Sequence, residues 1–360
     1  FNSGWLALVC ILFSAPANAG PLGLPDSARP GAVRPEETGR PAVPEGAPEA
    51  LLEIPAVIDR PLEVDEGAVV VVSRFRLVDA RDIPKFNLRV AELETLLAEQ
   101  AATRPEGFTI GQLQEVANQL TTFYRGKGLI LAQAALPVQT VEGGVVDIQV
   151  FEGKLGRVLA EGNEIYDKVL LEIPFKGLIG EPVSKDEIES ALLTLTDYPG
   201  LTVFGVFQPG QQVGTADIVL RVQEEKRFDI AFRADNHGVQ ETGRMRFQPT
   251  IEWNNVTATA DKLTLSVQQT YNPKKSDFLS VDYERFLGRG FQAGAFFNRN
   301  KFDLGGEFAR QQIHGETENI GGWLDKDWFR SRQFNLMTRL GFEREESITT
   351  ARGEQVNLDR

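Results

Sequence analysis

The sequence predicts an α+β region of two tandem β-α-α-β-β units, followed by an antiparallel transmembrane β-barrel. Three observations carry this prediction: an N-terminal export signal, a helix-and-strand pattern that occurs twice between residues 69 and 224, and alternating apolar and polar residues from Phe228 onward. Alternation with a period of two gives a strand one apolar and one polar face. Segments of about ten such residues are typical of strands that cross an outer membrane. A soluble β-sandwich gives a similar alternation, so the export signal is part of the argument.

Composition limits the possible functions. The net charge of −13 argues against a nucleic-acid partner. The single cysteine, Cys10, lies in the N-terminal apolar segment, so the mature chain is expected to have no disulfide, thiol nucleophile or thiolate metal site. No later stretch reaches the ~18 apolar residues of a transmembrane helix. Export without cysteine or apolar helix fits a protein that reaches the outer membrane through the periplasm.

The N-terminal region has two parts. The apolar run Gly4–Ala19 ends in a small-x-small sequence, so residues 1–19 are assigned to a signal peptide. Nine of the 19 prolines lie between Pro21 and Pro61, which predicts an extended proline-rich linker over residues 20–66.

The first repeated unit is expected over residues 67–153. A helix within Leu88–Ala101 has apolar residues on one face. A second helix follows Thr109, and Gln112 three residues later completes a capping-box pattern. The expected strands are Val69–Val78, Leu129–Val138 and Val145–Phe151.

The second unit, over residues 154–226, repeats this order more compactly. Ser184, with Glu187 three residues later, forms another capping-box pattern before its longer helix. The remaining expected elements are a strand at Leu155–Ala160, a short helix at Tyr166–Ile173 and strands at Leu201–Phe207 and Ala216–Val222. Each unit is therefore predicted to pack two helices on a three-stranded sheet.

Residues 227–360 are predicted to form the N-terminal part of the barrel. Short turns are expected at one end of the strands and longer loops at the other, as in outer-membrane barrels. An unfinished sheet would leave its edges in lipid, so further strands are expected after Arg360. The expected strands are residues 228–235, 244–254, 262–271, 278–286, 291–299, 313–328 and 332–345.

Several motifs occur in a specific order along the chain. They are LTTFYRGKG at Leu120–Gly128, VVDIQVFEG at Val145–Gly153, DYPGLTVFGVFQP at Asp197–Pro209, GTADIVLRV at Gly214–Val222 and DNHG at Asp235–Gly238. In this order they resemble the two-partner secretion transporters of the Gram-negative outer membrane, the haemolysin and filamentous-haemagglutinin secretion/activation proteins. The resemblance identifies the β-α-α-β-β units as tandem POTRA domains.

The resemblance also implies a function. It predicts an outer-membrane pore that recognises an unfolded exoprotein through periplasmic POTRA domains and translocates it to the cell surface. The expected partners are that exoprotein, outer-membrane lipid and the barrel-assembly machinery that inserts the protein, with no nucleic acid. The alternative is a POTRA-barrel insertase that assembles other outer-membrane proteins, and the count of two units favours secretion. A plain porin or adhesin would need no periplasmic units.

No enzymatic activity, cofactor or metal is expected. His237 and His314 lack ligand spacing, and the carboxylates of Asp325 and Asp327 suit a polar barrel lumen better than a hydrolase dyad. The family has an inward-folding loop with an arginine-glycine-aromatic tip. Arg289-Gly290-Phe291 has this sequence, but it lies between the predicted strands 278–286 and 291–299, near the start of the barrel region. A simple turn is therefore expected there.

The function is then expected to consist of binding an exoprotein and passing it through the barrel. An exposed edge strand of a small sheet can pair with an extended peptide. The predicted substrate-binding edge is the second strand of the first unit, with Leu129, Leu131 and Ala134, although these side chains could also fill the core. The residues expected to line the pore are Arg233, Arg244, Arg246, Asp282, Glu284 and Arg339.

Overall fold

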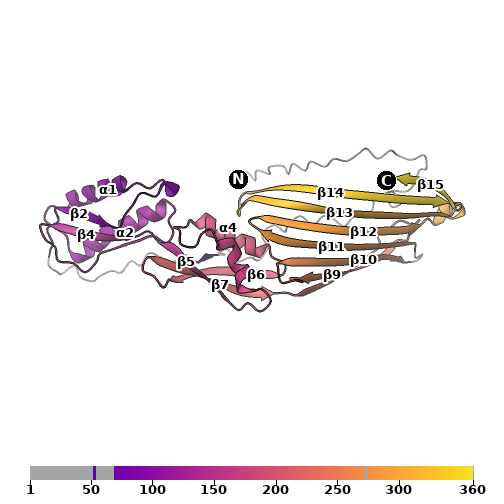
Figure 1. The fold of residues 1–360 in the computed structure, drawn as a ribbon, viewed down its shortest axis with the longest axis horizontal. Coiled ribbons are helices and arrows are strands. Elements are labelled where there is room, and N and C mark those ends of the chain that lie inside the picture. Colours follow the sequence, from indigo (N-terminus) through magenta and orange to yellow (C-terminus); the bar gives the residue numbers. More distant parts are fainter. Residues whose placement is uncertain (1–51, 54–68, 272–274, 360) are drawn as a thin grey trace.

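A computed structural model of the chain describes residues 52–53, 69–271 and 275–359. The predicted signal peptide, 1–19, lies outside the described residues, and so does the predicted linker, 20–66, except for residues 52–53. Three sheets follow one another along the long axis of the molecule (Figure 1). No helix in the described part of the chain is long and apolar enough to cross a membrane.

The first unit, residues 69–153, has a three-stranded sheet in the order β2-β4-β3. Strand β4 is parallel to β2 and antiparallel to β3. Buried apolar residues of both helices pack with those of the sheet in one core. The elements are β2 (Arg74–Val78), the 3-10 helix η2 (Pro84–Phe86), α1 (Val90–Thr103), α2 (Ile110–Gly126), β3 (Gln133–Ala135) and β4 (Val145–Phe151).

The predicted capping box of α2 is confirmed. The backbone N–H of Gln112 donates to Thr109 Oγ1 at 3.3 Å, and the backbone N–H of Thr109 donates to Gln112 Oε1 at 3.0 Å. Two donors at the helix start are thereby satisfied. Ser184 and Glu187 form the second predicted capping box, at the start of α4.

The predicted strand Leu129–Val138 is much shorter than expected. Only Gln133–Ala135 pairs with β4, because residues 130–131 form a turn and Pro137 has no N–H to donate. The turn carries Ile130 away from the first unit and into the core of the second.

The second unit, residues 154–226, has a four-stranded sheet in the order β1-β6-β7-β5. Strands β5, β6 and β7 repeat the topology of the first unit, and β1 pairs with the outer edge of β6. The elements are β1 (Leu52–Glu53), β5 (Lys154–Glu161), α3 (Lys168–Glu172), the 3-10 helix η3 (Ile173–Phe175), α4 (Lys185–Thr196), β6 (Leu201–Pro209) and β7 (Thr215–Glu225).

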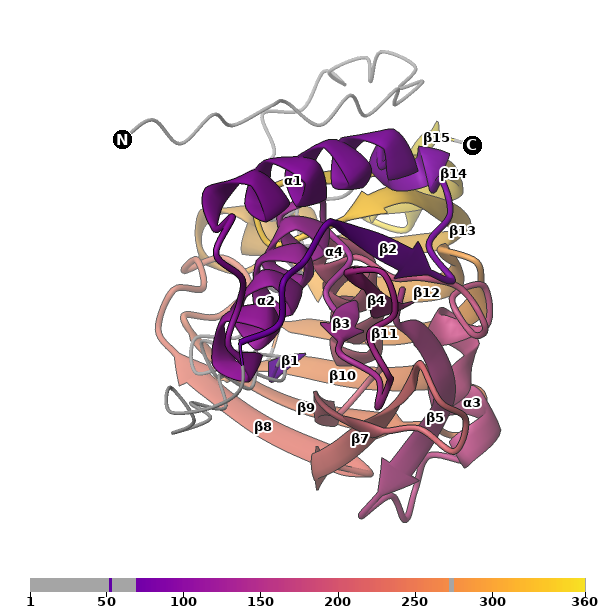
Figure 2. The ribbon, with the colours of Figure 1, turned by 90° about the vertical axis from the view of Figure 1, so that its left-hand side faces the viewer.

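The third sheet contains eight antiparallel strands, in sequence order from β8 to β15. Figure 2 shows it as a curved wall behind the two units. The strands are β8 (Phe228–Asp235), β9 (Met245–Asn254), β10 (Asp261–Tyr271), β11 (Ser276–Gly288), β12 (Phe291–Asp303), β13 (Ile313–Arg330), β14 (Asn335–Ala351) and β15 (Glu354–Asp359), with the 3-10 helix η4 (Gly306–Gln311) before β13.

The strands differ from the prediction in number and in length. Seven strands are predicted, but β15 is an eighth, and β12 and β14 extend beyond their predicted ends at Arg299 and Glu345. Directly after these predicted ends, Lys301, Asp303 and Glu346 take positions of the apolar face, so the period-two signal weakens although the backbone pairing continues.

Candidate functional site

The eight-stranded sheet has two chemically different faces. In the pairing of β10 with β11, Leu265 lies opposite Val281 on one face, whereas Thr264 lies opposite Asp282 on the other. The apolar face is exposed to its surroundings, as lipid-facing side chains are. Its exposed members include Phe228, Ile230, Phe232, Met245, Phe247, Ile251, Leu265, Val267, Leu279, Ile320, Leu340 and Phe342.

Five of the six predicted pore-lining residues share the polar face of the sheet. By strand register these are Arg233, Arg246, Asp282, Glu284 and Arg339. Arg244 precedes β9 and lies in the connection from β8, outside the regular sheet.

Three pairs of opposite charge cross between neighbouring strands on the polar face. Arg246 donates to Asp235 at 2.7 Å, and Lys262 lies 3.0 Å from Glu284. Arg339 donates to Asp325 through two nitrogens, at 2.8 and 2.9 Å. The face therefore carries both signs of charge, with more carboxylates than cations by strand register.

Aromatic rings on the polar face lie flat over glycines of the neighbouring strand, a feature that the sequence analysis missed. A Cβ at Gly321 would stand 2.5 Å from the Phe296 ring, and one at Gly294 would stand 2.4 Å from the Trp323 ring. The Arg339 guanidinium covers Trp323 from 4.6 Å. Such ring-on-glycine packing supports a strand that lacks a side chain. Glycines inside predicted strands were the available signal.

The predicted substrate-binding side chains do not form an open surface. Leu129 and Ala134 are only 1% and 2% exposed and belong to the core of the first unit. Leu131 is half-buried and packs against the core of the second unit. What remains accessible is the backbone of β3, which pairs on one side only in the described residues.

An extended segment of the chain occupies the edge of the other POTRA-like sheet. Strand β1 runs parallel to β6, with Leu52 opposite Gly205 and Glu53 opposite Val206. The Leu52 side chain is 7% exposed and joins the core of the second unit. This pairing could not be predicted from the sequence, because two residues within a proline-rich stretch give no periodic signal.

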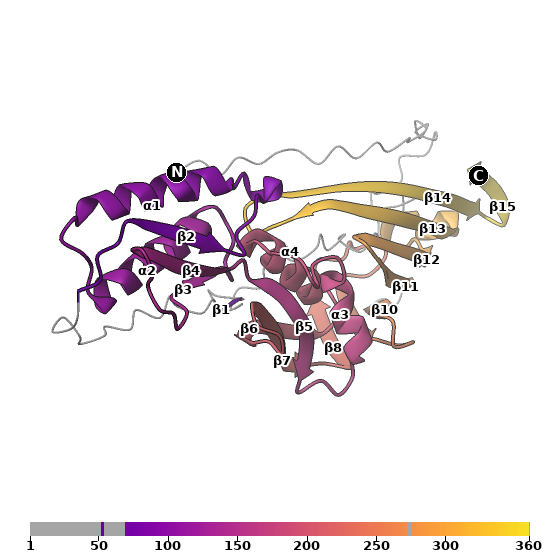
Figure 3. The same cartoon turned by 60° about the vertical axis from the view of Figure 1, so that its left-hand side comes forward.

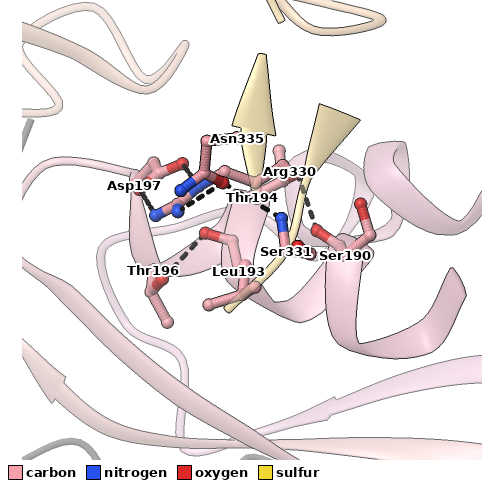
Figure 4. A network of polar contacts seen from close by, with 8 residues as sticks. All are labelled: Ser190, Leu193, Thr194, Thr196, Asp197, Arg330, Ser331 and Asn335. Atoms are coloured by element: carbon pink, nitrogen blue, oxygen red, sulfur yellow. Dashed lines mark hydrogen bonds and ion pairs between the residues drawn. The ribbon is translucent and has the colours of Figure 1, made fainter. Parts of the chain in front are cut away.

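A buried ion pair joins the second unit to the sheet. Figure 4 shows Arg330, at the end of β13, reaching Asp197, the C-cap of α4. The guanidinium donates to both carboxylate oxygens, at 2.7 and 2.8 Å, and also to Asn335 Oδ1 at 3.2 Å. The two side chains are only 11% and 8% exposed. Two parallel hydrogen bonds fix the orientation of the pair as well as its distance.

An aromatic cluster extends this contact. The Tyr198 ring lies 5.1 Å from Phe286 of β11 and 5.9 Å from Tyr166, whose hydroxyl donates to Pro199 O at 2.6 Å. Burial raises the pKa of the Tyr166 phenol, and the neighbouring Tyr198 adds to this. Both rings are therefore neutral packing groups at ordinary pH.

A second turn of the sheet also contacts the second unit. Asn255, in the connection between β9 and β10, donates to Ile165 O at 3.0 Å, and Ala260 is buried in the core of the second unit. Figure 3 shows α4 against the sheet ends nearest to this unit. The connections β9–β10 and β13–β14, together with Phe286 next to the connection β11–β12, thus hold the second unit.

The two units meet through a smaller contact. Ile130 and Leu131 enter the core of the second unit, and Lys85 lies 2.8 Å from Glu187. Burial acts to raise the pKa of Glu187, but hydrogen bonds from Lys85 and Ser184 outweigh it and lower the pKa.

The arrangement lacks features of a metal site. No group of three or more His, Cys, Asp or Glu side chains in the described ranges could hold a metal ion. The chemistry available at the sheet edges and the polar face is backbone pairing, charge pairing and ring packing.

Two β-α-α-β-β units in front of an antiparallel sheet with an exposed apolar face define an outer-membrane protein with POTRA domains in the periplasm.

Two parts of the chain match models of known protein families. Residues 214–360 match the family model "Haemolysin secretion/activation protein ShlB/FhaC/HecB", and residues 82–153 match "POTRA domain, ShlB-type". The resemblance to the haemolysin secretion/activation proteins that the motifs predict is therefore confirmed. The predicted location, in the outer membrane with periplasmic POTRA domains, agrees with these matches.

Individual relatives support the same conclusion. The heme/hemopexin transporter protein HuxB of Haemophilus influenzae strain 86-028NP is 27% identical over 258 residues, which is 69% of this chain and 46% of the relative. The hemolysin transporter protein ShlB of Serratia marcescens is 25% identical over 225 residues, 61% of this chain and 39% of the relative. The chain thus spans less than half the length of these relatives.

A solved structure has the same fold. The structure of CdiB from Escherichia coli matches with a TM-score of 0.59 at 20% sequence identity, covering 85% of this chain and 55% of that one. The predicted fold class, tandem POTRA units followed by an outer-membrane β-sheet of the barrel type, is confirmed.

Proposed function

We propose that the protein is a two-partner secretion transporter. In this proposal the periplasmic units recognise an unfolded exoprotein as an extended segment, and the polar face of the sheet passes it to the cell surface. The proteins named above as transporters of heme/hemopexin and of hemolysin support this class of activity. Binding and passage, without catalysis or a cofactor, account for the function.

The pairing of β1 with β6 is the single observation that carries the recognition step. An edge strand that accepts one extended segment offers the same backbone groups and the same apolar site to another. The parallel register over Leu52 and Glu53, with Leu52 in the core, supplies both features. We therefore place recognition at the β6 edge, with the free edge of β3 as a second pairing surface in place of the side chains of Leu129, Leu131 and Ala134.

The passage step uses the polar face. Three ion pairs reduce the field along this face, and the carboxylates that remain in excess disfavour strongly acidic segments. Arg233, Arg246, Asp282, Glu284 and Arg339 are proposed to line this path, and Arg244 to lie at its outer end.

The proposed domain division follows the three sheets. Residues 67–153 form POTRA 1, residues 154–226 form POTRA 2, and residues 227–360 form the N-terminal part of the barrel. Residues 1–19 are proposed to be a signal peptide and 20–66 a linker that supplies β1.

A reversible disulfide tests the recognition step. Glu53 and Val206 are Cα partners, so Glu53→Cys with Val206→Cys places two thiols within disulfide range. The oxidised full-length protein should bind and export its exoprotein several-fold less well, because β1 then cannot leave the β6 edge. A reductant should restore both activities.

A matched pair of cysteines serves as the control. Arg76 and Asp147 are partners in the parallel pairing of β2 with β4, so Arg76→Cys with Asp147→Cys links strands that block no edge. This variant should keep full export when oxidised. Unchanged export by the oxidised Glu53–Val206 variant would refute recognition at β6. Normal export with impaired assembly of other outer-membrane proteins would instead support the insertase.

A further inference from the structure

We propose that the outward face of the sheet carries a binding site for the phosphate headgroup of an anionic phospholipid in the periplasmic leaflet. The site, here called the basic corner, consists of Arg285, Arg289, Lys326, Phe291 and Trp328. It goes beyond the transport function and does not depend on the exoprotein.

Strand register places the basic corner on the lipid-facing side. Arg285 lies opposite Ala293, and Phe291 lies opposite Lys326, on the face that carries the exposed apolar residues. The turn between β11 and β12 fixes the depth, because a Cβ on Gly288 would stand 3.7 Å from Ile173 of the second unit. The basic corner therefore lies where the apolar face ends next to the periplasmic units.

The aromatic rings hold the lysine in a defined position. The Lys326 ammonium lies 4.4 Å from the Phe291 ring centre and 5.6 Å from that of Trp328. It also donates to the backbone oxygen of Arg289. The Trp328 indole N–H donates to Thr338 Oγ1 at 3.1 Å, which fixes that ring. Tryptophan and lysine in this arrangement are typical of the membrane–water interface.

The cations of the basic corner lack acidic partners. Within the described ranges, no ion pair involves Arg285, Arg289 or Lys326. Asp261 lies opposite Arg285 in the pairing register, but its carboxylate accepts hydrogen bonds from Thr257 and Tyr283 instead.

The other end of the same face has the opposite arrangement. Arg299 donates to Glu316 at 2.6 Å, and Lys301 lies 3.4 Å from the same carboxylate. Arg344 lies 3.4 Å from Glu346. Cations are thus compensated by protein carboxylates at the far end and uncompensated at the periplasmic end. A lipid phosphate is the anion that the membrane supplies at that position.

Exposed apolar side chains beside the cations suit the rest of a lipid molecule. Leu287 is 55% exposed and Trp328 is 59% exposed, and Phe329 and Phe334 form an exposed ring pair 6.2 Å apart in the next turn. The basic corner is continuous with the lipid-facing surface, so a bound phosphate leaves the acyl chains against that surface.

Tryptophan quenching in proteoliposomes tests the proposal. The full-length protein is reconstituted with brominated phosphatidylglycerol or brominated phosphatidylcholine, and the Trp328 signal is obtained by difference against Trp328→Phe. We expect a preference of roughly fivefold or more for phosphatidylglycerol. The variant Arg285→Gln/Arg289→Gln/Lys326→Gln should reduce this preference to about one.

A control variant with the same change in net charge distinguishes lipid binding at the basic corner from a general attraction of anionic lipid to positive charge. Arg299→Gln/Lys301→Gln/Arg344→Gln removes three cations from the far end of the same face and should keep the preference. Heat-modifiable gel mobility verifies that both variants are folded. Equal quenching by the two lipids in the wild-type protein would overturn the proposal, and so would equal loss in both variants or a preference unchanged in the basic-corner variant.

Discussion

The second unit is joined to its two neighbours in different ways. On the sheet side, two connections, an aromatic cluster and a buried bidentate ion pair hold it. On the side of the first unit, Ile130 and Leu131 and the exposed pair of Lys85 with Glu187 make the contact. The difference indicates that the second unit moves with the sheet, whereas the position of the first unit depends on a few side chains.

The largest expected effect comes from Asp197→Ala. The substitution leaves Arg330 buried without its carboxylate, which costs about 3–5 kcal/mol for a buried pair. Amide hydrogen exchange of the full-length protein should be faster in α4 and in the turn from β13 to β14 by roughly a hundredfold to a few thousandfold. Adding Arg330→Met should recover part of the loss, because the unpaired charge is then absent. Unchanged exchange in Asp197→Ala would show that the aromatic cluster alone holds this junction.

The second effect is that of Ile130→Ala. This side chain is 7% exposed in the core of the second unit, so its truncation should cost about 2–4 kcal/mol. Hydrogen exchange should accelerate around the contact of the two units, with the turn from β13 to β14 unchanged. Equal acceleration at both junctions would contradict the distinction between them.

The third effect depends on pH and is smaller. Because the pKa of Glu187 is lowered in the folded protein, its pairing with Lys85 contributes stability above the unfolded-state pKa of about 4.3 and loses it as pH falls through the folded-state value. The contribution should be about 0.2–1 kcal/mol, because the pair is partly exposed. Stability of the contact between the units should be flat from about pH 7 to 5 and decline below about pH 4. Glu187→Gln should flatten this decline, and an unaltered decline would assign it to other carboxylates.

The smallest effect is expected for an exposed ion pair, which serves as a reference for the buried pair of Asp197 with Arg330. Arg76 and Asp147 form an exposed ion pair within the first unit, and the hydrogen bond from Arg76 lowers the pKa of Asp147. Arg76→Ala should change the melting temperature little, because an exposed ion pair in water contributes little net stability. A loss of stability as large as that of Asp197→Ala would show that burial does not explain the difference between the two ion pairs.

Local signals in the sequence predict local structure well. The capping boxes at Thr109 and Ser184 gave the starts of α2 and α4, and alternation gave β4 and β8 with their observed bounds. Capping and alternation depend on residues a few positions apart, so one sequence is enough to read them.

Features that depend on distant partners could not be predicted in this way. Asp197 and Arg330 are 133 residues apart, and neither has a local pattern that names the other. The burial of Leu129 and Ala134 follows from the turn at Ile130, which no periodicity indicates. Five of the six residues that were predicted to line a pore share one face, because the face of a strand residue follows from alternation alone.

The rings that cover glycines have a consequence for assembly. Along β12 and β13, Phe296 lies opposite Gly321 and Gly294 lies opposite Trp323, so large and small residues alternate across the pair. A slip of two residues would keep every side chain on its face, but one direction would set Phe296 against Trp323 and the other would set Gly294 against Gly321. Either slip removes the packing of both rings on glycine, and the second also sets two residues without side chains opposite each other, so each mispaired hairpin is less stable. Side-chain packing in this hairpin therefore selects the correct register of β12 with β13. Strands that pair with this hairpin during assembly then start from a correctly aligned edge.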